Sequence, residues 1–229
     1  MHKFNKIQLV TDWFSEEAQN ITFDFETRSI CSLYARLMRK HGLNFATGKG
    51  VVADFGPGKE DGKCKQATPF FLFSSTRDIR GFERLSDLDK KKLTLDLIDY
   101  VMEGVSHSIG VTESGFTCVS AEIESMSFQN SWRWRKGTTK SPDQSMKCDI
   151  FVDHEVSQFD LRAVVSDKSG TVLREGVIHR CSKPDELVID GHLGELIWFS
   201  EDEARLNPKS YFRDPICFRI HDLTEVDGI

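Results

Sequence analysis

Carboxylates and imidazoles lie close together at several places in the last third of the sequence. The side chains of this group are Asp153, His154, Glu155, His179, Asp190 and His192. Such side chains could ligate a divalent metal ion or act as a general acid–base pair. Neighbouring residues of a strand point to opposite faces, however, and the spacings match no known metal-binding motif. A metal-dependent hydrolase using positions within 153–192 is therefore kept as the second alternative, and we predict neither a bound metal ion nor a cofactor.

The stretch NSWRWRKGTTKS, residues 130–141, alternates tryptophan with arginine. In an extended strand the two tryptophans would share one face and the two arginines the other. If exposed, the tryptophans could stack on bases while the basic side chains contact phosphates. Nucleic-acid binding or processing is therefore the first alternative, with the site formed by Trp132, Arg133, Trp134, Arg135 and Lys136. Burying two tryptophans stabilises a fold more than exposing them, so we expect both in the core.

Acidic residues are concentrated near the end of the chain, which carries a net charge of −6. Segment 183–203 has seven carboxylates and a single cation, Lys183. Charge blocks of this kind influence association rather than fold. These carboxylates are the predicted partner-binding surface: Asp185, Glu186, Asp190, Glu195, Glu201, Asp202 and Glu203.

Motifs that would define an enzyme are missing from the sequence. It contains no G-x-S-x-G nucleophile motif, no P-loop and no G-x-G-x-x-G motif. We therefore expect a non-enzymatic, cytoplasmic protein that binds a basic protein partner through its acidic C-terminal surface and occludes it. In general character, though not in any motif, the chain is similar to small bacterial immunity proteins and phage-encoded inhibitors of defence systems. No apolar run approaches the ~20 residues of a membrane helix, so no membrane partner is expected.

The elements that position these residues follow from hydrophobic periodicity. The first 110 residues are predicted to form the order ββαββα. The strands are expected at 5–11, 20–26, 51–55 and 69–76, and the helices at 28–41 and 87–106. Ser86 is the expected N-cap of the second helix. Within 20–26, alternation of Ile21, Phe23 and Phe25 with polar residues indicates a half-buried strand.

The pattern beyond residue 115 is β-like throughout. Alternation over 159–180, around a turn that ends at Gly170, predicts a hairpin. Further strands are predicted at 186–190, 194–199 and 215–221, with a short helix opening at the SEDE segment, 200–203. Together these elements predict an α+β fold, in which a mixed N-terminal half packs on a C-terminal antiparallel β-meander. We expect one domain, 1–229, with a subdomain boundary near 110–115.

Overall fold

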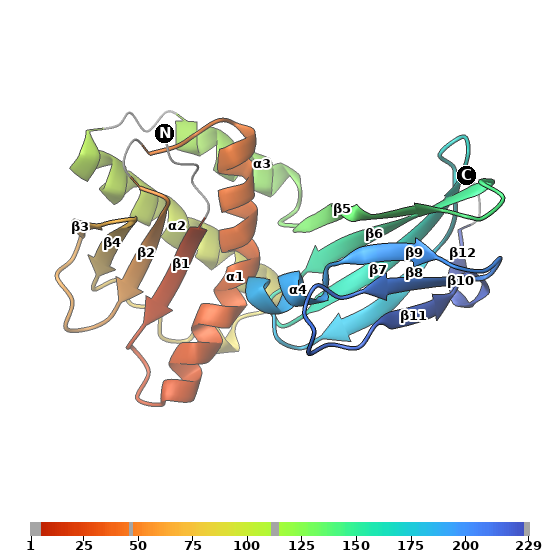
Figure 1. The fold of residues 1–229 in the computed structure, drawn as a ribbon. Coiled ribbons are helices and arrows are strands. Elements are labelled where there is room, and N and C mark those ends of the chain that lie inside the picture. The colour runs from red at the N-terminus through yellow and green to blue at the C-terminus, as the bar shows by residue number, and fades with distance from the viewer. Residues whose placement is uncertain (1–5, 46–47, 111–114, 227–229) are drawn as a thin grey trace. The chain divides into compact units, whose positions relative to one another are not determined.

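The computed structural model describes residues 6–45, 48–110 and 115–226 (Figure 1). The α+β class is confirmed, because helices and strands mix in the N-terminal half and antiparallel strands make up the C-terminal half. The chain divides into two compact units, 1–129 (unit 1) and 130–229 (unit 2). The predicted boundary near 110–115 contains residues 111–114, which lie outside the described residues, whereas the units divide between Gln129 and Asn130.

Unit 1 contains a four-stranded sheet in the order β1-β2-β4-β3. Its strands are β1 (Lys6–Thr11), β2 (Gly50–Phe55), β3 (Lys63–Ala67) and β4 (Phe70–Ser75). β1, β2 and β4 are parallel, and β3 pairs antiparallel with β4. Residues alternate between the two faces of each strand, so Leu9, Ala53 and Phe73 enter the core while Leu72 stays exposed. One face of the sheet is therefore buried, and the other is only partly covered.

The described residues of unit 1 also form three α-helices and a short 3₁₀ helix. They are α1 (Glu17–Lys40), η1 (Phe82–Arg84), α2 (Asp87–Ile109) and α3 (Phe116–Ser125). Figure 1 shows α2 behind the sheet and α1 alongside β1. The Ser86 side chain caps α2 by accepting a hydrogen bond from Asp89 N, and Gly110 ends it with a φ of 68°. The predicted cap is confirmed.

Two predictions for unit 1 are wrong. Residues 20–26 belong to α1 rather than to a strand, because the helical stripe that includes Ile30 and Tyr34 begins at Phe23. Only Phe23 of the alternating residues is buried, whereas Ile21 is exposed. The β-like segment that starts at residue 116 begins with α3, whose buried Val119 and Ile123 are four residues apart. The order of elements in unit 1 is consequently βαβββαα, with β3 as an additional strand.

Unit 2 is a sandwich of two antiparallel sheets, which share one hydrophobic core. The larger sheet has the order β12-β8-β7-β6-β5. Its strands are β5 (Ser131–Lys140), β6 (Met146–His154), β7 (Phe159–Asp167), β8 (Val172–Cys181) and β12 (Thr224–Glu225). The smaller sheet consists of β9 (Glu195–Trp198), β10 (Glu203–Asn207) and β11 (Ile216–Arg219), and a 3₁₀ helix, η3 (Ile220–Asp222), follows it. β5 to β8 form the predicted meander, and Gly170 takes a φ of 92° in the predicted hairpin turn.

Two segments of unit 2 differ from the sequence-based prediction. Residues 186–190 are helical, in α4 (Glu186–His192), because the Asp185 side chain caps a helix by accepting a hydrogen bond from Leu187 N. The SEDE segment opens no helix. It leads into β10 instead, where Ala204 and Leu206 alternate into the core against Trp198 and Leu196 of β9. The predicted strands at 194–199 and 215–221 are present as β9 and β11.

Candidate protein-binding site

The seven predicted carboxylates fall into two groups at opposite ends of the β9–β10 hairpin. Glu195 pairs with Asn207 at one end of the ladder, and Ala204 pairs with Trp198 at the other. The first group belongs to α4 and the start of β9, and comprises Asp185, Glu186, Asp190 and Glu195. The second group is on the turn that connects β9 to β10, and comprises Glu201, Asp202 and Glu203. The carboxylates therefore do not form one continuous surface.

Several of these carboxylates are neutralised by basic residues outside segment 183–203. Lys209 Nζ lies 2.5 Å from Asp190 Oδ2, and Arg219 Nε lies 3.6 Å from Glu203 Oε1. Asp202 contacts the His221 imidazole, and its pKa is lowered by hydrogen bonds from the His221 backbone and ring although burial acts in the opposite direction. Local pairing therefore makes this part of the surface less negative than the sequence suggests.

The Trp/Arg segment lies on β5, at an edge of the larger sheet. Trp132 and Trp134 pack against the core of unit 2, and the Trp134 indole N–H donates to Gly194 O at 3.0 Å. Both indoles face the core, as expected, but they are partly buried against it rather than enclosed in it. Arg133, Arg135 and Lys136 are exposed at the strand edge, where basic side chains commonly discourage pairing with another strand. Binding of nucleic acid at this segment would therefore depend on the basic side chains, because both indoles are engaged in the fold.

The carboxylate and the imidazole of the Asp153–His154 pair point in opposite directions, as the strand pattern predicts. Asp153 lies on the outer face of β6 and accepts a hydrogen bond from Arg162 Nε at 2.8 Å. His154 is fully buried on the inner face, with its Nε2 3.1 Å from Pro184 O. Glu155 directly follows β6. No group of three or more His, Cys, Asp or Glu residues suited to holding a metal ion occurs within residues 6–45, 48–110 and 115–226.

His179 and His192 lie side by side inside unit 2. Their ring centroids are 4.4 Å apart, and the Arg213 guanidinium donates to His192 Nε2 at 2.6 Å. Burial, followed by the charge of Arg213 and then by His179, lowers the pKa of His192 to about 4. The pKa of His179 is lowered by the same two leading causes. Both imidazoles are thus neutral near pH 7, and His192 accepts a hydrogen bond that holds Arg213.

The loop that connects β10 to β11 presents two aromatic side chains to solvent. Tyr211 and Phe212 have exposed fractions of 101% and 97%, and Leu187 on α4 has 81%. Burying one such side chain is worth roughly 1.5–3 kcal/mol, so exposing both to water contributes nothing to the stability of the fold. Exposed apolar groups that are gathered in one place commonly mark an interaction site.

The β10–β11 loop is held against α4 at three points. Lys209 pairs with Asp190, Ser210 N donates to Gly191 O at 3.2 Å, and Arg213 donates to His192. The approach is so close that a Cβ atom on Gly191 would lie 3.1 Å from Arg213 Nε. Two of these contacts involve residues of the predicted clusters, Asp190 and His192. Their role here is to position the loop that carries Tyr211 and Phe212.

Tyr211 and Phe212 are not among the predicted site residues, although the sequence around them indicates that they are exposed. The two aromatics are adjacent, and Pro208 and Pro215 flank them within a segment that has no period-2 or period-3.6 pattern. Adjacent aromatics in such a segment cannot both be buried by a regular element, because neighbouring side chains of a short loop point in different directions.

Segment 48–65 of unit 1 is rich in glycine and lysine, and one of its lysines, Lys59, is engaged within the fold. Lys59 Nζ lies 2.9 Å from Asp12 Oδ2 and 2.7 Å from Asp54 Oδ2, at the carboxyl ends of β1 and β2. The hydrogen bonds that the Lys59 ammonium group donates to Asp54 and Asp12 raise the pKa of Lys59. Since two carboxylates already hold this ammonium group, the segment is poorly suited to binding a phosphate.

Comparisons of the chain with protein-family models, with curated proteins and with solved structures find no match. No helix in the described part of the chain is long and apolar enough to cross a membrane. Because no known protein matches, the candidate site is defined only by the geometry of the described residues. It consists of α4 and residues 209–213 of the β10–β11 loop, which we call the α4 face.

Proposed function

We propose that the protein binds another protein through the α4 face. The observation that carries this proposal is the pair of fully exposed aromatic side chains, Tyr211 and Phe212, on a loop that is fixed to α4 at three points. Aromatic residues are enriched in the cores of protein interfaces and among the residues that contribute most to binding. Because the loop is already ordered, less conformational entropy is lost on association.

The partner should offer an apolar pocket with basic residues at its rim. Leu187 extends the apolar area of the α4 face, while Asp185 and Glu186 add negative charge at the start of the helix. Complementary charge at a rim mainly raises the association rate, and apolar contacts at the centre contribute most of the affinity. By covering part of the partner's surface the protein would act as an inhibitor, which is the role expected from its sequence.

The test begins with a photo-crosslinking amino acid at position 212, or at position 199 as a matched control, in cells of the organism of origin. Phe199 is a half-exposed aromatic at the opposite end of β9. A specific partner should cross-link from position 212 and not from position 199. With that partner purified, Tyr211→Ala and Phe212→Ala should each weaken binding about tenfold or more, equivalent to about 1.4 kcal/mol, and Phe199→Ala less than about threefold. Unchanged affinity in both loop variants would contradict the proposal.

A second measurement separates the two groups of carboxylates. If the α4 face is the interface, Glu186→Lys should slow association and reduce its dependence on salt, whereas Glu201→Lys should have little effect. The reverse result would move the interface to the β9–β10 turn.

A further inference from the structure

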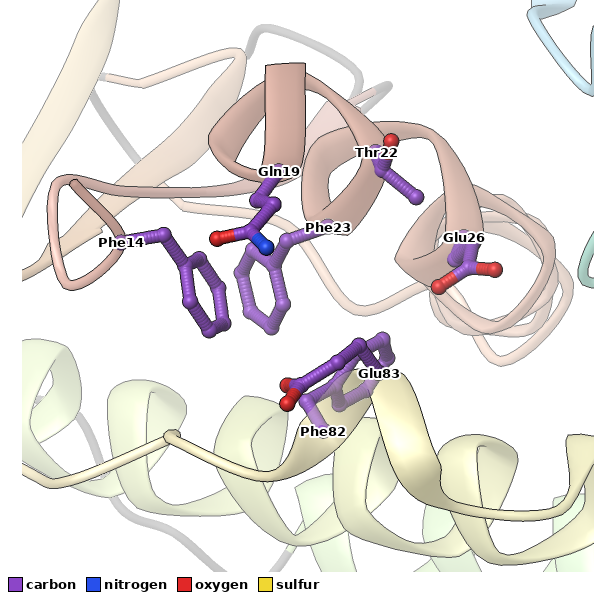
Figure 2. Close-up of a pocket in the computed structure, with 7 residues that line it drawn as sticks. All are labelled: Phe14, Gln19, Thr22, Phe23, Glu26, Phe82 and Glu83. Carbon is purple, nitrogen blue, oxygen red and sulfur yellow. The ribbon is translucent and has the colours of Figure 1, made fainter. Parts of the chain in front are cut away.

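The small hollow between α1 and η1 in unit 1 does not form a ligand site (Figure 2). It encloses about 70 Å³, whereas sites for small molecules usually enclose about 300–1,000 Å³. Phe23 and Phe82, on its wall, are only 1% and 2% exposed, so the fold already covers their ring faces. The part of unit 1 that is suited to a partner is instead the outer face of its sheet.

The outer face of the unit 1 sheet is apolar at its centre. β2 and β4 are the two central strands, and their outward side chains include Val52, Phe70 and Leu72. Val52 and Phe70 are half-buried, and Leu72 is 44% exposed. Figure 1 shows α2 behind the sheet and α1 alongside β1, so within the described part of unit 1 no helix lies over β2 and β4 on this side. Parallel strands are usually covered on both faces, and unit 1 supplies only one of these layers.

Lysines lie on both sides of this apolar centre, on the outer strands β1 and β3. Lys65 on β3 pairs with Leu72 across the ladder, so the two side chains share the outer face. Lys6 on β1 alternates with the buried Ile7 and therefore points to the same face. Lys49 directly precedes β2. All three lysines are exposed, and none is in an ion pair within the described residues. In a chain of net charge −6, the outer face is thus a local positive region.

The carboxylates nearest to the outer face are already held by other side chains. Asp54, near the carboxyl end of β2, lies 2.7 Å from Lys59 Nζ. Asp24 of α1 lies 2.8 Å from Arg28 Nη2 and accepts a hydrogen bond from Gln8 Nε2 at 3.1 Å. The lysines at the amino ends of the strands therefore keep their charge available for a partner.

We propose that the outer face of the unit 1 sheet binds an acidic amphipathic helix of a partner protein. A helix is about 10 Å wide, which matches two strands spaced about 4.8 Å apart and leaves β1 and β3 on its flanks. The apolar stripe of the helix lies on Val52, Phe70 and Leu72, and its flanking carboxylates face Lys6 and Lys65. Strands of six residues span about 20 Å, the length of about 13 helical residues. The α4 face takes no part, so this inference is independent of the function proposed for that face.

The probe is a designed peptide of about 18 residues, helical over about 27 Å, with leucines on one face and glutamates on the other. In a second peptide, lysine replaces every glutamate. Each is titrated into the full-length protein, and the methyl signals of Val52 and Leu72 are followed by NMR, with those of Leu187 as a reference on α4. The glutamate peptide should give saturable shifts at Val52 and Leu72 and none at Leu187, and the lysine peptide should bind this face at least about tenfold more weakly. Equal shifts from both peptides, or shifts at Val52 and Leu72 from neither, would overturn the proposal.

Two variants test the apolar centre and the charged flank. Leu72→Glu should weaken binding of the glutamate peptide at least about tenfold. Leu88→Glu, in the first turn of α2, is the matched control, because Leu88 is 49% exposed, and it should change the affinity less than about twofold. Lys65→Glu changes an exposed side chain of an edge strand, so it preserves folding, and it should weaken binding severalfold and reduce its dependence on salt. If Leu72→Glu and Lys65→Glu both bind the glutamate peptide like the wild type, the inference is wrong.

Discussion

Protonation of His192 should destabilise unit 2 below neutral pH. The imidazole is buried, and its Nε2 must remain unprotonated to accept the hydrogen bond from Arg213. Its pKa is about 4 in the folded protein, compared with 6.5 for an ordinary histidine. Between these two values the unfolded chain binds more protons than the folded protein. Stability from this group is thus full above about pH 6.5 and falls as the pH decreases toward about 4, below which no further loss occurs.

The magnitude follows from the difference between the two pKa values. A tenfold change in proton affinity corresponds to about 1.36 kcal/mol, so the full difference is worth about 3 kcal/mol of unfolding free energy. A loss of this size is a large fraction of the roughly 5–15 kcal/mol that stabilises a typical domain. The pKa of His179 is also lowered, so protonation of this second imidazole likewise reduces the free energy of unfolding as the pH decreases.

The assay is urea unfolding at several pH values between about 7 and 4, followed by tryptophan fluorescence. Trp132, Trp134 and Trp198 all pack in the core of unit 2, so they report on its unfolding. In His192→Gln the amide oxygen can accept from Arg213 without titrating. The free energy of unfolding of the wild type should therefore fall by up to about 3 kcal/mol relative to this variant as the pH decreases.

The matched control is His107→Gln, which changes an exposed histidine in the last turn of α2 and should follow the wild type at every pH. Carboxylates distant from His192 contribute equally to the wild type and to His192→Gln, so their effect cancels in the comparison. If the wild type and His192→Gln lose stability in parallel between about pH 7 and 4, the reasoning about this imidazole is refuted.

Three further predictions concern other parts of the fold. Lys90→Met should destabilise unit 1 by about 3 kcal/mol in urea unfolding, because the Glu26 carboxylate loses the buried ammonium that pairs with both of its oxygens. An unchanged urea midpoint would show that water solvates the Glu26 carboxylate in place of the Lys90 ammonium group. Trp134→Phe should cost about 1–2 kcal/mol, since Gly194 O loses its indole donor and a smaller ring fills the site. Tyr211→Ala should change the melting temperature by no more than about 2 °C, because the side chain is fully exposed; a larger decrease would mean that the tyrosine stabilises the fold.

Local sequence patterns predicted those elements whose stabilising interactions lie close together in the chain. Helix α2 begins at Ser86 and ends at Gly110, where a cap and a positive φ are encoded in single residues. The β7–β8 hairpin likewise depends on alternation and on the Gly170 turn. Similarly, the alternation of residues 132–135 correctly separated the half-buried indoles, which face the core, from the exposed arginines.

Packing decided the structure of segments whose sequences suit more than one element. In residues 20–26 the alternation of phenylalanines fits a strand, yet α1 buries Phe23 together with Ile30, which lies two turns further along. The SEDE segment has the spacing of a capping box, but pairing with β9 buries Ala204 and Leu206 and draws the following residues into β10. Contacts with residues distant in sequence outweigh local preference in both cases.

The sequence by itself determined the α+β class, the long elements with clear periodicity and the excess of carboxylates near the end of the chain. The tertiary structure alone decided which charges are neutralised and which apolar groups stay in water. Lys209 and Arg219 lie outside the acidic segment in sequence but pair with it in space. Tyr211 and Phe212 are exposed because α4 holds their loop away from the core through hydrogen bonds and one ion pair. Such contacts depend on the distances between side chains of different elements, and no local pattern in the chain encodes those distances.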